Sequence, residues 1–172
     1  MSDTIRELII QEFLTRAATL RNTASPPAYA TDMGDNVFRA RPRVDPAELP
    51  CCVIWPLAEE AEHAHGLVRH RMTIRLDGIV AFGAESPSVV GERMLGDLIK
   101  CFTSPTWDRR RPVLVTSPAS PVTYTYLAPY AESIVYEGGG IQEYPEEGSI
   151  SVGVQVRFLV TYWTKIGDPY NQ

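Results

Sequence analysis

Residues 149–164, which read SISVGVQVRFLVTYWT, constrain the fold most because apolar and polar residues alternate there almost without interruption. Side chains of a strand point alternately to opposite faces, so this period of two predicts one long β-strand with an apolar face. That face carries Ile150, Val152, Val154, Val156, Phe158, Val160 and Tyr162. A straight strand of this length reaches roughly 50 Å, whereas a compact domain of this size is about 40 Å across. We expect the strand to bend near Gly153, and an arm that reaches a neighbouring subunit is the alternative.

A second long alternation covers residues 66–82, GLVRHRMTIRLDGIVAF. Its apolar face carries Val68, His70, Met72, Ile74, Leu76, Gly78, Val80 and Phe82, and an interruption is expected at Gly78. Its other face carries Arg69, Arg71, Arg75 and Asp77. This pattern predicts a strand with one side in the core and a charged side that is solvated or placed against an acidic surface.

Two segments have the apolar spacing of amphipathic helices. The first covers residues 4–21 and begins with a capping box formed by Thr4 and Glu7. The second begins with Ser86 as its cap and Pro87 in its first turn, and it ends at residues 103–105. Residues 22–36 between the first helix and the first strand are rich in turn formers and predict a surface loop.

Shorter β-segments complete the pattern. Residues 36–40 predict an edge strand, residues 51–57 a buried strand ended by Pro56, and residues 132–140 a strand ended by three glycines. Residues 104–131 are rich in proline and in short β-forming pieces, which predicts an extended hairpin or loop insertion. The whole order predicts a single α+β domain over residues 1–172, with a mainly antiparallel β-sheet of long strands flanked by two helices.

Composition narrows the functional classes. The chain is 44% hydrophobic and 22% charged, as in ordinary globular domains. Its net charge of −5 argues against a dedicated nucleic-acid binder. No stretch approaches the ~20 apolar residues of a membrane span, and the N-terminus has no apolar signal region. With three cysteines, two of them adjacent, we expect a soluble intracellular protein in a reducing compartment.

No group of residues predicts catalysis, a cofactor or a metal ion. His63 and His65 lie near Glu60 and Glu62, but the four fall in a predicted turn and a metal site needs converging ligands. No nucleophile elbow of the form Gly-x-Ser-x-Gly occurs. The run GGGI at residues 138–141 does not lead into a predicted helix, so it is interpreted as a turn and not as a phosphate loop. The chain is therefore predicted not to be an enzyme.

Two arginine clusters are candidates for contact with DNA or a partner protein. Arg109, Arg110 and Arg111 are consecutive, and the run RARPR at residues 39–43 adds a second basic segment. Aromatic residues for base stacking are not interleaved with these charges, so passing contact with DNA is favoured over specific binding.

The order of these motifs resembles the tail terminator, or tail completion, proteins of long-tailed bacteriophages, the group that includes the lambda tail terminator. The resemblance is carried by NVFRARPRV, PCCVIWPLAEE, RHRMTIRLDGIVAFG, SVVGERMLGDLIKCF and GSISVGVQVRFLVTYWTKIGDP, which follow the N-terminal amphipathic helix and its loop. It covers essentially the whole chain in order of elements, whereas residues 104–131 are where the chain is most individual.

The resemblance implies a structural virion protein that forms a hexameric ring at the head-proximal end of the tail tube. Such a ring stops tube polymerisation and presents a docking surface for head–tail joining. Its implied partners are further copies of itself, the tail tube protein, a neck or connector protein, and genomic DNA that passes through the lumen without sequence-specific binding. The implied location is the virion tail, with the host cytoplasm during assembly, and no cofactor is involved.

A ring of this kind needs an interface between subunits. The hypothesis from the charged strand face is that Arg69, Arg71 and Arg75 pair with acidic residues across that interface; the candidates are Glu143, Glu146 and Glu147. A neck or head–tail connector protein is the nearest alternative within the structural class. A nucleic-acid-binding accessory protein and a small cytosolic enzyme are the alternatives from other classes.

Overall fold

The computed structural model describes residues 3–23, 28–103, 115–117, 120–123, 130–143 and 148–172, with the backbone alone for 115–117, 120–123 and 143. Its main body is a five-stranded sheet in the order β1-β2-β3-β7-β6. The strands are β1 (Val37–Arg39), β2 (Cys51–Ala64), β3 (Leu67–Ala81), β6 (Ser133–Glu143) and β7 (Ser151–Lys165). The other elements are α1 (Ile5–Ala17), the 3-10 turn η1 (Pro46–Glu48), α2 (Pro87–Thr103), and the separate pair β4 (Val115–Ser117) and β5 (Ser120–Thr123).

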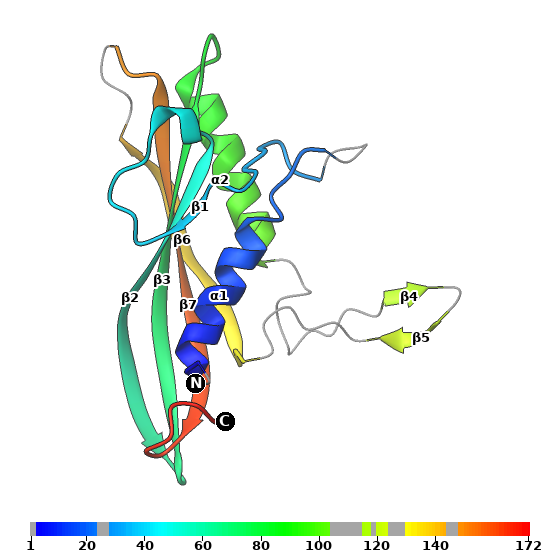
Figure 1. The fold of residues 1–172 in the computed structure, drawn as a ribbon, viewed down its shortest axis with the longest axis vertical. Coiled ribbons are helices and arrows are strands. Elements are labelled where there is room, and N and C mark those ends of the chain that lie inside the picture. Colours follow the sequence, from blue (N-terminus) through cyan, green and yellow to red (C-terminus); the bar gives the residue numbers. More distant parts are fainter. Residues whose placement is uncertain (1–2, 24–27, 104–114, 118–119, 124–129, 144–147) are drawn as a thin grey trace.

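This architecture confirms the predicted α+β fold. Every pairing in the main sheet is antiparallel except that of β1 with β2, which is parallel. Both helices lie on one face of the sheet, and the strands run along the long axis of the molecule (Figure 1). That face is called the inner face below, and the opposite one the outer face.

The longest predicted strand lies entirely within the chain's own sheet. β7 pairs with β3 from Ser151 to Lys165 without a change of register, and β6 lies on its other side. The strand therefore continues through Gly153, and the alternative prediction, an arm that reaches a neighbouring subunit, is wrong. Because the sheet is elongated (Figure 1), a strand of this length fits along it.

The predicted end of the second strand at Pro56 is wrong. β2 continues through Pro56 to Ala64, with a register shift beside the proline. β1 covers only Cys52 to Ile54 of β2, so the missing N–H of Pro56 lies where no β1 residue is paired. The histidine segment consequently lies on a strand, and the turn follows at His65 and Gly66.

Gly78 does not interrupt β3, since its missing side chain makes room for α2. A Cβ atom there would lie 2.7 Å from the Met94 side chain and 2.9 Å from that of Leu98. The glycine thus lets the second helix approach the sheet closely.

The three glycines of β6 also lie within a strand, not in the turn that was expected. Gly138, Gly139 and Gly140 pair with residues of β7, and the register shifts on either side of them. A Cβ atom at Gly139 would lie 2.5 Å from the backbone oxygen of Gln155, so no side chain fits at this position. The strand therefore needs glycine where sequence patterns predict a break.

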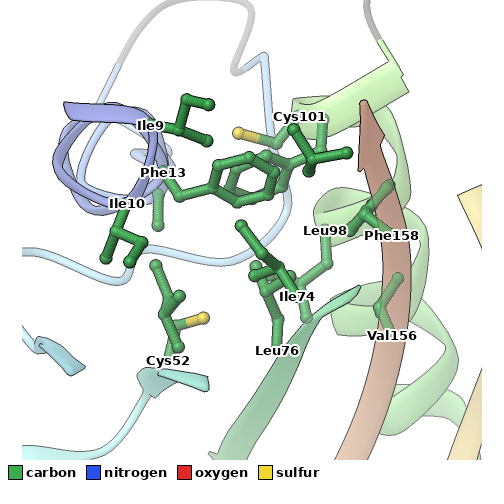
Figure 2. Close-up of a cluster of buried hydrophobic side chains, with 14 of the residues drawn as sticks. Ile9, Ile10, Phe13, Cys52, Ile74, Leu76, Leu98, Cys101, Val156 and Phe158 are labelled. Atoms are coloured by element: carbon green, nitrogen blue, oxygen red, sulfur yellow. The ribbon is translucent and has the colours of Figure 1, made fainter. Parts of the chain in front are cut away.

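The core lies between the inner face and the two helices. Phe13 of α1 stacks on Phe102 of α2 with ring centroids 4.9 Å apart, and Phe158 of β7 closes the cluster, which Figure 2 shows with Cys52 and Ile74. The predicted strand faces are confirmed as buried, apart from partly buried residues at strand ends and exposed Ile150.

The helices also differ in detail from expectation. α1 ends at Ala17, four residues before the predicted end, but Leu20 stays buried because the chain turns back there and its carbonyl accepts from the Met33 amide. α2 begins as predicted at Pro87, and the apolar side chain of Val89 in its first turn is exposed. Within the described part of the chain, no helix has the length and apolar character needed to cross a membrane.

Candidate assembly surface

The outer face is built by alternate residues of the four long strands. Arg69, Arg71 and Arg75 point there from β3, as their alternation with buried Val68, Met72, Ile74 and Leu76 requires. In the described part of the chain neither α1 nor α2 packs on this face (Figure 1), although some of its side chains, among them Gln155 and Thr161, are buried.

Two of the three predicted interface arginines already have partners in the same chain. Arg75 lies 3.0 Å from Asp77 and over the ring of Trp55, at 5.1 Å from the ring centroid. Arg69 lies 3.8 Å from Glu132 and 5.7 Å from the centroid of Trp163. These contacts hold both guanidinium groups along the sheet.

Arg71 differs from its neighbours. Its side chain is exposed, and among the residues that the structure describes it has no ion pair. The register places it beside Glu60 of β2 and Thr161 of β7. Of the three arginines, Arg71 is the one whose charge remains available for a partner.

Of the predicted acidic partners, only the Glu143 backbone belongs to the described part of the chain. The Glu143 backbone pairs with Gly153, at the level of Ile79, far along the sheet from Arg69 and Arg71. Glu146, Glu147, Arg109, Arg110 and Arg111 lie outside the described residues. Pairing across a subunit boundary stays a prediction.

A shallow groove of about 410 Å³ follows the glycines of β6. Arg157 and Gln155 line it from β7, and Arg157 donates to the Gln155 side chain at 3.2 Å. Gln155 in turn donates to Asp77 at 3.3 Å. Because Gly138 lies opposite Arg157 and has no side chain, the arginine lies next to the open edge of the sheet.

A polar network on the inner face was not predicted from the sequence. One carboxylate oxygen of Glu59 lies 2.9 Å from Nδ1 of His70, and the other accepts from the Tyr162 hydroxyl at 2.5 Å. Nε2 of His70 lies 2.8 Å from the Thr164 hydroxyl, and the His70 ring stacks on that of Tyr162. Arg6 of α1 lies 3.7 Å from Glu59, so the network joins one helix to three strands.

The polar groups of this network form hydrogen bonds with one another. Both ring nitrogens of His70 are within hydrogen-bonding distance of a partner, and both Glu59 oxygens are occupied. Burial and the Glu59 carboxylate raise the pKa of Tyr162 well above its ordinary value, because both favour the neutral phenol. The arrangement is suited to fastening α1 to the sheet.

The sequence contained part of the signal for this network. His70 and Tyr162 were both placed on inner strand faces, and they are directly paired in the register of β3 and β7. Glu59 was missed because β2 was expected to end at Pro56, three residues earlier. A strand that continues past the proline is what places the carboxylate beside the histidine.

The remaining candidate residues are dispersed. His63 and His65 are both exposed, and no group of three or more histidine, cysteine, aspartate or glutamate residues is placed to hold a metal ion in the described ranges. The three cysteines are buried and unbridged. Burial raises the pKa of all three thiols, that of Cys51 to about 11, which disfavours the reactive thiolate.

Comparison with known proteins gives no assignment. A scan against models of protein families matches none. A search of curated proteins also finds no match. Any assignment of function to this chain therefore rests on its own residues and geometry.

Proposed function

We propose that the protein is a structural component of a bacteriophage tail, a ring at the head-proximal end of the tail tube that stops tube polymerisation and provides the docking surface for head–tail joining. The motifs that resemble tail terminators support this proposal. The observation that carries it is the elongated sheet, whose long strands have helices on one face and an outer face that no described helix covers (Figure 1). Such a subunit offers large surfaces to neighbours on several sides.

The proposed mechanism is steric and involves no reaction. One rim of the ring matches the last ring of the tail tube, and the other rim presents a different surface, so that no further tube ring adds. The second rim then binds the neck or connector protein. Genomic DNA passes through the lumen, and the net charge of −5 disfavours tight, sequence-independent retention of that DNA.

Charge reversal tests whether the outer face takes part in ring assembly. Arg71→Glu is the informative variant, because Arg71 is exposed and its loss breaks no ion pair among the described residues. Glu92→Arg on the exposed side of α2 is the matched control. If the outer face contacts a neighbour, Arg71→Glu lowers the oligomer mass in light scattering at a given concentration and the control does not. An oligomer unchanged by Arg71→Glu would count against the role of that arginine.

The function itself is tested by polymerisation of the cognate tail tube protein in the presence and absence of this chain. We expect shorter tubes of defined length, with additional density at one end in negative-stain images. Tubes of unchanged length with no bound density would contradict the proposal. A protein that binds the connector but leaves tube length unchanged would instead be a neck or connector component.

A further inference from the structure

The two outer edges of the sheet are both open. β1 pairs only with β2 and β6 pairs only with β7, so each has one side with no strand beside it in the described part of the chain. An open edge presents unpaired backbone N–H and C=O groups, which favour pairing with another strand. Proteins commonly protect such edges with lysine or proline, and β6 contains neither.

The two edges lie at the same level along the sheet. Following the register across the strands, Gly140 is in one row with Gln155, Asp77, Val53 and Phe38. By the same pairings Gly139 shares a row with Arg39, and Ile141 with Val37. Gly139, Gly140 and Ile141 of β6 and the three residues of β1 therefore occupy corresponding positions on opposite edges.

Each edge has one exposed charge of opposite sign that could meet the other. Near β1, Arg39 and Arg41 are ion-paired with Glu7 and Glu48 of the same chain, whereas Arg43 is exposed with no ion pair among the described residues. On β6, Glu137 is exposed and likewise has no described ion pair. Because Gly138 and Gly140 have no side chains, a neighbouring strand can approach this edge closely.

We propose that copies of this chain associate edge to edge, with β6 of one copy adding as an antiparallel strand to β1 of the next. This inference rests on the proposed ring, for which it names the interface. β1 runs parallel to β2, and three antiparallel pairings separate β2 from β6, so a copy in the same orientation presents β1 antiparallel to β6. The contact joins two different surfaces, and such head-to-tail contacts close into rings when each step adds a rotation. Sheet twist supplies a rotation between neighbouring strands.

The size of the contact predicts how the copies assemble. β1 has three residues, so one pair of edges forms few hydrogen bonds. A single contact is therefore weak, whereas a closed ring has no free edge left and is more stable than an open chain of the same copies. Assembly is expected to proceed from monomer to ring with few intermediates.

Disulfide crosslinking of the full chain tests this pairing. Phe38→Cys and Gly140→Cys are made in separate chains; a Cβ atom at Gly140 meets no other atom within 4 Å. The native cysteines are buried and contribute little under copper–phenanthroline oxidation. We expect a crosslinked dimer when the two variants are mixed and none from either variant alone. A chain with both substitutions should give a ladder on a non-reducing gel, and Glu92→Cys with Gly140→Cys is the control pair.

The possible outcomes distinguish a failure of this edge pairing from a failure of the proposed function. A crosslink from Gly140→Cys alone would mean that two β6 strands pair, which overturns the inference. Rings that form in light scattering while the mixture gives no crosslink would overturn the edge pairing and leave the ring intact. A chain that stays monomeric at every concentration would overturn both.

Charge reversal gives an independent readout of the same contact. Glu137→Arg and Arg43→Glu should each lower the oligomer mass at a given concentration, and mixing the two variants should restore it in part. If each variant assembles like the unmodified chain, the basic and acidic edges do not meet.

Discussion

At the scale of single residues, the glycines of β6 differ in the space around them. A Cβ atom at Gly139 would lie 2.5 Å from the Gln155 backbone oxygen, whereas one at Gly140 meets nothing within 4 Å. Backbone cannot move aside as a side chain does, so we expect Gly139→Ala to lower the free energy of unfolding by about 2 kcal/mol or more. Gly140→Ala is the matched control and should change it by less than about 0.5 kcal/mol. Urea denaturation measures both, and equal values would contradict the close approach of β6 and β7.

Tyr162 predicts a pH dependence at the same scale. Its pKa is raised in the folded protein by burial and by Glu59, while in the unfolded chain it titrates near 10. The folded state therefore holds the proton more tightly, and the resulting stabilisation is complete below pH 10 and lost as pH rises above it. The difference in unfolding free energy between the unmodified protein and Tyr162→Phe should shrink between about pH 10 and 11.

The control for that measurement is Tyr170→Phe, since Tyr170 is half exposed at 50%. This variant should keep the pH dependence of the unmodified protein. If Tyr162→Phe keeps it as well, the phenol is not held by the Glu59 network.

At the scale of elements, the first helix depends on its cap. The Thr4 hydroxyl accepts from the Glu7 amide at 3.2 Å, which is one half of the predicted capping box, whereas the Glu7 carboxylate pairs with Arg39. Removing such a cap typically costs about 1 kcal/mol, so Thr4→Ala should lower the free energy of unfolding by that amount. Thr15→Ala, at an exposed position inside the same helix, is the control and should be neutral or slightly stabilising. Equal losses in thermal or urea unfolding would show that the cap contributes nothing.

The elements also show which features could be predicted from the sequence. Strict alternation located β3 and β7, and helical spacing with Ser86 and Pro87 located α2, because in these segments the local pattern and the burial agree. The predictions failed at Pro56, Gly78 and the glycines of β6, where local breakers lie inside strands. In each case the reason is a neighbour in space: an edge left open beside Pro56, α2 against Gly78, and β7 against Gly139.

The candidate site could be predicted only in part, for the same reason. Alternation placed Arg69, Arg71 and Arg75 on the outer face, and the structure has them there. It placed Asp77 on the same face two residues from Arg75, but it could not indicate that Arg69 pairs with Glu132, because Glu132 is far from Arg69 in sequence. The Glu59 network and the correspondence of β1 with β6 depend on sheet order, which alternation alone does not determine.

At the scale of the whole molecule, the sheet combines a face covered by the two helices, a face that no described helix covers, and two open edges. A monomer would leave both edges open to solvent, including the unpaired backbone of β6. Assembly into a ring would bury the edges and leave the rims for the tube and the connector. The central claim is therefore that the protein assembles with itself.

The mass and shape of the purified full chain test this claim most directly. Light scattering over a range of concentrations, with negative-stain images of the same samples, should show closed rings of about six copies. Particles of one ring size that appear without long filaments would agree with head-to-tail contacts that close. A strict monomer at every concentration, with no rings in the images, would contradict the account.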